Sequence, residues 1–326
     1  MSAPSTRPTD TGTTPDSAAR KVPGRAIGFT LMTLLILFAG FWMQHQSELR
    51  DSSGTQVMPD DTVNVAGFRT DAFYLPDDAL LGFVLVPAGS FIMGSNPVLD
   101  PMAYENERWS ASRRQGSVEL DDFYIGRFEV TIAQFRAFAL DRQLAIGASM
   151  EGLPGNLPVS NVTWPEALAY ARWLEAALLA SDITPPELRQ ALGNGAHVTL
   201  ASEAEWEKAA RGEDGRVFPW GSERTDSFAN FAGAGPIAVG SIPCPLCSYG
   251  LSDMSGNVWE YTRSPLQDYP YDSSGDETKL SGEPLWVMRG GSFSDQINNV
   301  RAAVRGGVGP GVRSPGIGFR VVISSQ

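Results

Sequence analysis

The sequence predicts a mixed α+β domain with limited regular secondary structure, on three observations. Helix-start signals gather in the first part of the chain beyond position 80, short strand-like runs lie before and after them, and glycine and proline are abundant. The 326 residues include 34 Gly and 23 Pro, which predicts many turns and long loops. This content excludes a helical bundle or coiled coil, and the order of the elements favours the α+β class.

Apolar runs predict the first strands. Phe83–Val86 and residues 91–94 are both apolar, and the sequence Pro-Ala-Gly-Ser at 87–90 predicts a turn between them. Val118 and Leu120, followed by the apolar run at 123–125, predict a further strand.

Three capping boxes predict three helix starts. In a capping box, a Ser or Thr side chain bonds the backbone three residues on, where a Glu or Gln side chain reaches back. The pairs are Thr131 with Gln134, Thr163 with Glu166, and Ser202 with Glu205. Gly212 is expected to end the third helix, and beyond it the sequence predicts loops and short strands.

Charge and histidine content exclude several functions. Lys and Arg number 25 against 37 Asp and Glu, a net charge of −12, and no basic run lies beyond the N-terminal tail. Nucleic-acid binding is excluded because it requires a basic surface that neutralises phosphates. His45 and His197 are the two histidines of the chain, too few for a three-histidine iron site or a typical zinc site.

Residues 26–43 form an uncharged apolar run that is just long enough to span a bilayer. Arg20, Lys21 and Arg25 precede it, which predicts a cytoplasmic N-terminus and a C-terminal domain on the periplasmic or extracellular side of the inner membrane. A cleaved signal peptide is the alternative, although Trp42 and its neighbours make a poor cleavage site. The expected organisation is a disordered tail (1–25), a single-pass anchor (26–43), a linker (44–80) and one domain (81–326).

The motifs of the domain, taken in order, resemble those of the sulfatase-modifying-factor family, which includes the formylglycine-generating enzyme. The matching segments are VPAGSFIMGS (86–95), FYIGRFEVTIAQFRAF (123–138), PVSNVTWPEALAYARWL (158–174), TLASEAEWEKAARG (199–212), FPWG (218–221), GLSDMSGNVWEYTRS (250–264), VMRGGSFSD (287–295) and GIGFRVV (316–322). The resemblance covers about residues 81–326 and implies a C-type-lectin-like fold. Function does not follow from the fold alone.

The family's oxidase chemistry uses two cysteines after the RGGS motif, which hold copper(I) and receive the substrate thiol. The resemblance places those positions at Asp295 and Val300. Neither side chain is a thiolate, the ligand that suits this soft metal. We therefore expect no copper-dependent formylglycine generation.

The resemblance also implies a structural calcium in the segment 253–260. The ligands would be the Asp253 side chain, the carbonyls of Gly256 and Val258, and the Glu260 side chain, since calcium prefers oxygen ligands. The alternative is that the polar side chains of this segment satisfy the loop backbone.

Polar residues after the RGGS motif suggest a ligand-binding groove. Its candidate residues are Ser292, Asp295, Asn298, Asn299 and Arg301, with Asp295 and Ser292 the candidate catalytic residues. The alternative for the arginines, Arg289, Arg301, Arg305 and Arg320, is that they form buried ion pairs. The tryptophans Trp164, Trp206, Trp220 and Trp259 are expected in the core.

Cys244 and Cys247 are three apart, and the first expectation is a small disulfide that closes a turn in an oxidising compartment. Redox or metal-binding roles are the alternatives.

Two functions follow from these observations. The first is a membrane-anchored pseudoenzyme that binds a secreted or membrane protein partner and acts as a maturation accessory. The second is a family enzyme with altered oxidative chemistry, in which Asp295 is a base or a ligand for a hard metal. Formylglycine generation on a sulfatase cysteine is a minor third possibility.

Overall fold

The computed structural model describes residues 79–145, 147–278 and 284–325, which fall in the compact unit Asp61–Gln326. The expected tail (1–25) and anchor (26–43), and nearly all of the linker, lie outside the described residues. Within the described ranges, no helix is both long and apolar enough to cross a membrane.

The described residues form short strands and short helices joined by long loops, as the Gly and Pro content predicts. The strands are β1 (Phe83–Val86), β2 (Gly89–Met93), β3 (Gly116–Leu120), β4 (Phe123–Gly126), β5 (His197–Leu200), β6 (Trp259–Pro265), β7 (Trp286–Arg289), β8 (Arg305–Val308), β9 (Ile317–Gly318) and β10 (Val321–Ser324). The helices are α2 (Ile132–Asp141), α3 (Trp164–Ala180), α4 (Pro186–Gly193), α5 (Glu203–Arg211) and α6 (Ser274–Thr278), with single 3₁₀ turns η1 (Glu105–Glu107), η2 (Ala148–Met150), η3 (Ser248–Gly250) and η4 (Ile297–Asn299).

The first sheet has the strand order β1-β4-β10-β5 and is antiparallel throughout. Strand β10 lies inside this sheet, where Val322 is opposite Ile125 on one side and Thr199 on the other. Successive side chains of a strand point to opposite faces. Val321 and Ile323 accordingly pack into one core cluster and Val322 into another.

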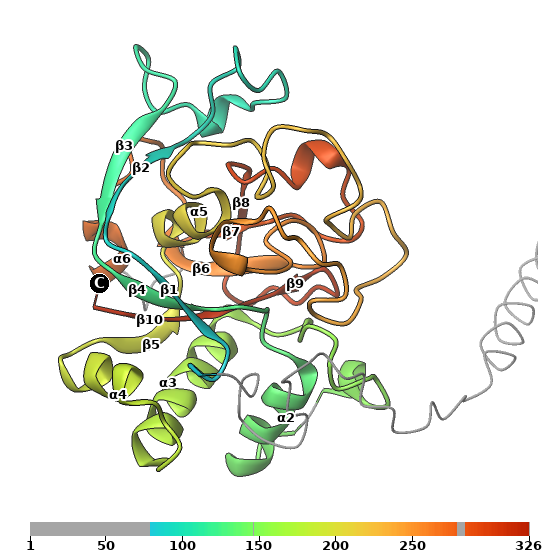
Figure 1. Ribbon diagram of the computed structural model, residues 1–326. Helices are drawn as coiled ribbons and strands as arrows, with labels where there is room; N and C mark the ends of the chain where they lie inside the picture. Colours follow the sequence, from blue (N-terminus) through green and yellow to red (C-terminus); the bar gives the residue numbers. More distant parts are fainter. Residues whose placement is uncertain (1–78, 146, 279–283, 326) are drawn as a thin grey trace, which may run out of the picture. The chain divides into compact units, whose positions relative to one another are not determined.

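The sheet therefore separates two layers, as Figure 1 shows. Helices α2, α3 and α4 lie on one face, where Phe135, Tyr170 and Phe319 pack with ring centroids 5.5–6.3 Å apart. On the other face lie α5 and a second sheet of order β8-β7-β6-β9. A third, two-stranded sheet pairs β2 with β3.

All three predicted capping boxes are confirmed. Thr131, Thr163 and Ser202 are the N-cap residues of α2, α3 and α5, and each box has both of its hydrogen bonds. Gly212 ends α5 with a φ of +67°, a conformation that glycine adopts without strain.

The predicted turn between the first two strands differs from the structure. Gly89 already belongs to β2, and the strands enter different sheets, so Pro87 and Ala88 form a bend between sheets. The Lys208 ammonium donates to the carbonyls of Pro87 and Gly89 at 2.6 and 2.9 Å, which fixes this bend from within the core. Helix α4 was not predicted, because Pro185 supplies no side-chain cap.

Helix α5 is unusual because its charged side chains are buried. They form ion pairs with arginines of the second sheet and with Arg211 of the helix itself: Glu203 with Arg289 and Arg305, Glu205 with Arg263, and Glu207 with Arg289 and Arg211. Removing one partner of a buried pair leaves an uncompensated charge, which is strongly destabilising. The pairs therefore fix the second sheet, and the loops that leave it, against the helix.

Candidate functional site

The loop after β7 carries the two positions at which the family's oxidase has cysteines. The chain turns sharply at Gly290 and Gly291, whose φ angles are +94° and +74°. A Cβ at Gly291 would lie 2.6 Å from the carbonyl oxygen of Asn299, so this close approach requires glycine. The turn brings residues 292–295 against the 3₁₀ turn η4.

Asp295 is the centre of a hydrogen-bonded polar cluster. Its Oδ2 accepts from Trp259 Nε1 at 2.9 Å, from the Ser292 amide at 3.0 Å and from Ser292 Oγ at 2.7 Å. Its Oδ1 accepts from Asn299 Nδ2 at 2.9 Å. The carboxylate thus holds the loop, η4 and β6 together, and both oxygens already have protein donors.

Val300 is sealed inside the protein, with no exposed surface. It packs in a small apolar cluster with Val217, Phe218 and Trp220, and its carbonyl accepts from Ser255 Oγ at 2.6 Å. The second of the two positions is therefore an apolar core residue. Together Asp295 and Val300 offer neither a thiolate nor a shared open coordination site.

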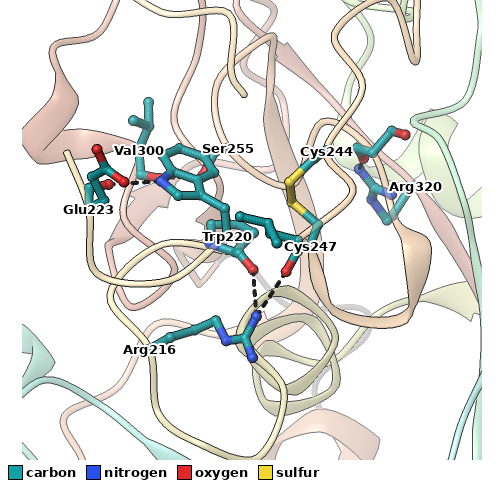
Figure 2. Close-up of a disulfide and its surroundings, with 11 residues drawn as sticks. Arg216, Trp220, Glu223, Cys244, Cys247, Ser255, Val300 and Arg320 are labelled. Atoms are coloured by element: carbon teal, nitrogen blue, oxygen red, sulfur yellow. Dashed lines mark hydrogen bonds between the residues drawn. A yellow bond between two sulfur atoms is a disulfide. The ribbon is translucent and has the colours of Figure 1, made fainter. Parts of the chain in front are cut away.

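The disulfide lies beside the apolar cluster that buries Val300, although its two cysteines are far from Val300 in the sequence. Cys244 and Cys247 are joined, with their Cα atoms 5.3 Å apart, and both pack against the cluster that buries Val300. Figure 2 shows the bridge and Val300 on opposite sides of Trp220. No local sequence signal predicts this neighbourhood, because the contacts come from the tertiary fold.

The predicted groove residues do not all lie together. Ser292, Asp295 and Asn299 share the polar cluster, and Asn298 is exposed beside it. Two residues of the cluster were missed. Tyr104 Oη donates to Asn299 at 2.8 Å, and Trp259, expected in the core, is half-buried and donates to Asp295.

Arg301 is not a groove residue. Its guanidinium is buried in ion pairs with Asp100 and Glu107, each at 2.6 Å, and lies 5.2 Å from the centre of the Tyr104 ring. Arg289, Arg305 and Arg320 likewise pair with buried carboxylates, which was the alternative left open for these arginines. Helix α5 supplies the acidic partners of Arg289 and Arg305, and strand β6 supplies that of Arg320.

The segment expected to hold calcium contains buried carboxylates that already have partners. Glu260 accepts from Arg320 Nη2 at 2.6 Å and Nε at 2.7 Å, and from Trp206 Nε1 at 2.7 Å. Asp253 accepts from the Gly240 amide at 2.6 Å. Calcium at this loop would have to displace Arg320 from Glu260, so the donors as placed do not fit the ion. Nor do the described residues contain any group of three or more His, Cys, Asp or Glu side chains arranged to hold a metal.

Arg320 faces more than one acid. Glu129, held by Asn257 and the Val258 amide, lies near Asp253 and Glu260. Burial, reinforced by these two carboxylates, raises the pKa of Glu129 well above its usual value. Burial also raises the pKa of Asp253 to about 6, against the lowering effect of the Gly240 amide. The environment therefore favours the neutral forms of Glu129 and Asp253 even with Arg320 in place.

His197 takes no part in any of these clusters. It is exposed on β5, with Nδ1 3.2 Å from Glu175. It forms no catalytic triad with the polar cluster.

The two sheets, the helices on one face and the long loops define the class of formylglycine-generating-enzyme-like α+β domains with a C-type-lectin-like fold. Residues 75–325 match the family described as the sulfatase-modifying factor enzyme 1-like domain, and the chain belongs to this family. The resemblance found in the sequence motifs is thus confirmed.

Relatives within the family carry different names. The chain is 30% identical over 269 residues to the hercynine oxygenase of Mycolicibacterium smegmatis, covering 68% of this chain and 56% of that protein. It is 30% identical over 190 residues to the inactive C-alpha-formylglycine-generating enzyme 2 of Mus musculus, covering 52% and 50%. The chain spans about half the length of these relatives. Among solved structures, PvdO from Pseudomonas aeruginosa aligns with a TM-score of 0.58 and 24% identity, over 74% of this chain and 94% of that one, which supports the fold.

Proposed function

We propose that this protein is a non-oxidising accessory member of its family, which binds a secreted or membrane protein and assists its maturation. One observation carries the proposal: the positions at which the oxidase needs two thiolates hold Asp295, tied to four protein donors, and Val300, which has no exposed surface. Copper(I) requires soft sulfur ligands, and neither residue provides one. A relative named as inactive supports the same interpretation.

The binding surface in this proposal is the polar groove formed by Ser292, Asp295, Asn298 and Asn299. Asn298 is exposed, so its side-chain amide is available to a peptide backbone at the rim of the cluster, whereas the Asn299 amide already bonds Tyr104 and Asp295. The loop beneath them is held in one conformation by Asp295, which lowers the entropic cost of binding.

Location is the second part of the proposal. The apolar run 26–43 and its preceding basic residues favour a single-pass anchor in the inner membrane, with the domain on the periplasmic or extracellular side. A disulfide between Cys244 and Cys247 is consistent with such an oxidising compartment.

The test of the chemistry is an oxidation assay. The full chain is incubated with copper, oxygen and a cysteine-containing peptide, and the peptide is analysed by mass spectrometry beside a formylglycine-generating enzyme as positive control. We expect no formylglycine above the buffer control. Formation of formylglycine by this chain would overturn the proposal.

The test of the binding role is site-specific photo-crosslinking in the producing cells. A photoreactive residue at Asn298 is expected to give a discrete adduct with one partner protein, and the same group at exposed Leu140 on α2 is not. Identical adduct patterns at both positions would argue against a binding role for the groove.

The similarity to hercynine oxygenase keeps a second candidate, an enzyme with altered oxidative chemistry, open to test. In that case Asp295 would act as a base or hard-metal ligand and would have to release Trp259 or Ser292 first. An Asp295→Asn variant keeps an acceptor for Asn299 and removes the charge. Full biological function of that variant would exclude the enzymatic candidate and leave the accessory role.

A further inference from the structure

A cleft of about 510 Å³ opens on the surface, and none of the groove residues lines it. It is lined by Leu99, Asp214, Gly215, Arg216, Val217, Trp220, Gly221, Ser222 and Leu246. None of these residues belongs to the polar cluster around Asp295. The cleft is large enough for one or two amino-acid side chains, and nothing in the mechanism of the proposed function uses it.

The lining of the cleft is mixed, with apolar side chains beside the polar side chains of Asp214, Arg216 and Ser222. Leu99 and Leu246 line it with 69% and 59% of their surfaces exposed, so both offer apolar area that a ligand can cover. Trp220 and Val217 are buried beneath, and the Trp220 ring stacks on Phe218 at 4.9 Å. An apolar side chain that entered here would cover both leucines.

A disulfide and the hydrogen bonds of Arg216 hold the wall formed by Leu246 in place. Leu246 lies inside the turn that the Cys244–Cys247 disulfide closes, and the Cys247 amide donates to the Cys244 carbonyl at 3.1 Å. Arg216 Nη1 donates to the carbonyls of Leu246 and Pro219 at 3.0 and 3.1 Å, which joins the disulfide turn to the floor, as Figure 2 shows. The cleft is therefore preformed, and binding costs little ordering of the chain.

Acidic side chains outnumber basic ones in the segment 213–226, which contributes much of the cleft lining. Arg216 donates to both oxygens of Asp214 at 2.9 and 2.7 Å, and this hydrogen bonding holds the pKa of Asp214 below its usual value. Arg216 and Asp214 thus neutralise each other, and the net negative charge of the segment comes from its other exposed acids. Exposed acids in the surrounding segment are Glu213, Asp214, Glu223 and Asp226, against Arg216 and Arg224 as bases.

We propose that this cleft binds a peptide segment of a partner protein in which an apolar side chain is flanked by lysine or arginine. The apolar side chain packs against Leu99 and Leu246, and the basic neighbour lies against the exposed acids of the segment 213–226. The chain's overall charge of −12 favours the approach of such a basic segment. The proposal does not depend on the accessory role of the groove, because the two sites share no residue.

The experiment uses the full chain and a fluorescein-labelled hexapeptide of alternating leucine and lysine, with fluorescence anisotropy as the readout. We expect saturable binding with a dissociation constant below about 1 mM. A peptide with glutamate in place of lysine, and one with glycine in place of leucine, should each bind at least about tenfold more weakly.

Variants separate this cleft from general attraction to an acidic protein. Leu246→Ser and Leu99→Ser should weaken binding about tenfold, and Asp214→Asn should weaken it and reduce its salt dependence. Leu140→Ser is the matched control, because Leu140 is 70% exposed but lies on α2. Thermal melts verify that each variant is folded. The proposal is overturned by absence of saturable binding, by equal binding of the lysine and glutamate peptides, or by cleft variants that bind like the control.

Discussion

Arg320 and Glu260 form a buried ion pair with two contacts, in which Nη2 and Nε of the guanidinium lie 2.6 and 2.7 Å from the two carboxylate oxygens. The pair joins the residue before β10 to strand β6, so it connects the two sheets of the domain. Arg320 also donates to the carbonyls of Gly126 and Ser252, each at 3.0 Å. One side chain thus connects the first sheet, the segment 252–260 and the second sheet.

Removing this guanidinium should be strongly destabilising. Arg320→Met leaves Glu260 buried without its partner, and we expect the free energy of unfolding to fall by about 3–5 kcal/mol in urea titrations. Arg313→Met is the control, since its pair with Glu166 is half-exposed and contributes less than about 1 kcal/mol. Equal losses in both variants would contradict the role assigned to Arg320.

Calcium removal should have no effect on stability. An ion bound at 253–260 would compete with Arg320 for Glu260, so we expect the same melting temperature in excess calcium and in chelator. Differential scanning fluorimetry of the full chain measures this directly. A chelator-induced decrease that Asp253→Asn abolishes would instead establish the calcium site that the sequence motif implies.

Stability should depend on pH through Asp276. Burial raises the pKa of this carboxyl to about 6, although hydrogen bonds from Ser264 and Tyr271 oppose the shift. The native state therefore favours the neutral acid, and its stabilising contribution is present below about pH 4 and lost as the pH rises through 6.

Comparison with Asp276→Asn isolates this contribution, because the amide does not ionise. The unfolding free energy of the variant relative to the unsubstituted protein should rise by about 2 kcal/mol between pH 4 and pH 7 in urea titrations. A difference that is the same at both pH values would show that Asp276 titrates normally.

Engineered cysteines test the geometry of the two positions at which the family's oxidase has cysteines. A thiol in Val300→Cys should resist iodoacetamide in the native protein, because the position has no exposed surface, whereas Asp295→Cys should be labelled. The native cysteines are bridged and give no background. Denaturant serves as control by exposing both thiols, and rapid native labelling at position 300 would contradict the buried placement.

Local signals allowed the start of each capped helix to be predicted from the sequence. A capping box is complete within four residues, so Thr131, Thr163 and Ser202 marked their helices correctly. Helix α4 begins at Pro186 without such a box and was missed. The bend at residues 87–88 was wrongly predicted as a turn between paired strands. The strands β1 and β2 pair instead with β4 and β3, which lie further along the chain and give no signal at the bend itself.

The candidate site could be predicted in part. Substitution of the two cysteine positions was visible from the motif alone, and the structure explains how Asp295 and Val300 are accommodated. The burial of the charged side chains of α5 was not predictable, because the arginine partners of Glu203, Glu205 and Glu207 on the second sheet lie far away in the sequence. Arg301 was misplaced for the same reason, since Asp100 and Glu107 lie far away in sequence.

The interior position of β10 has a consequence for biosynthesis. A ribosome produces β1, β4 and β5 well before Val321–Ser324, yet β10 is the strand that joins β4 to β5. Until that strand emerges, the nascent chain carries unpaired edges at β4 and β5, and Glu260 has no Arg320 to pair with. Completion of the first sheet is therefore a late step of folding.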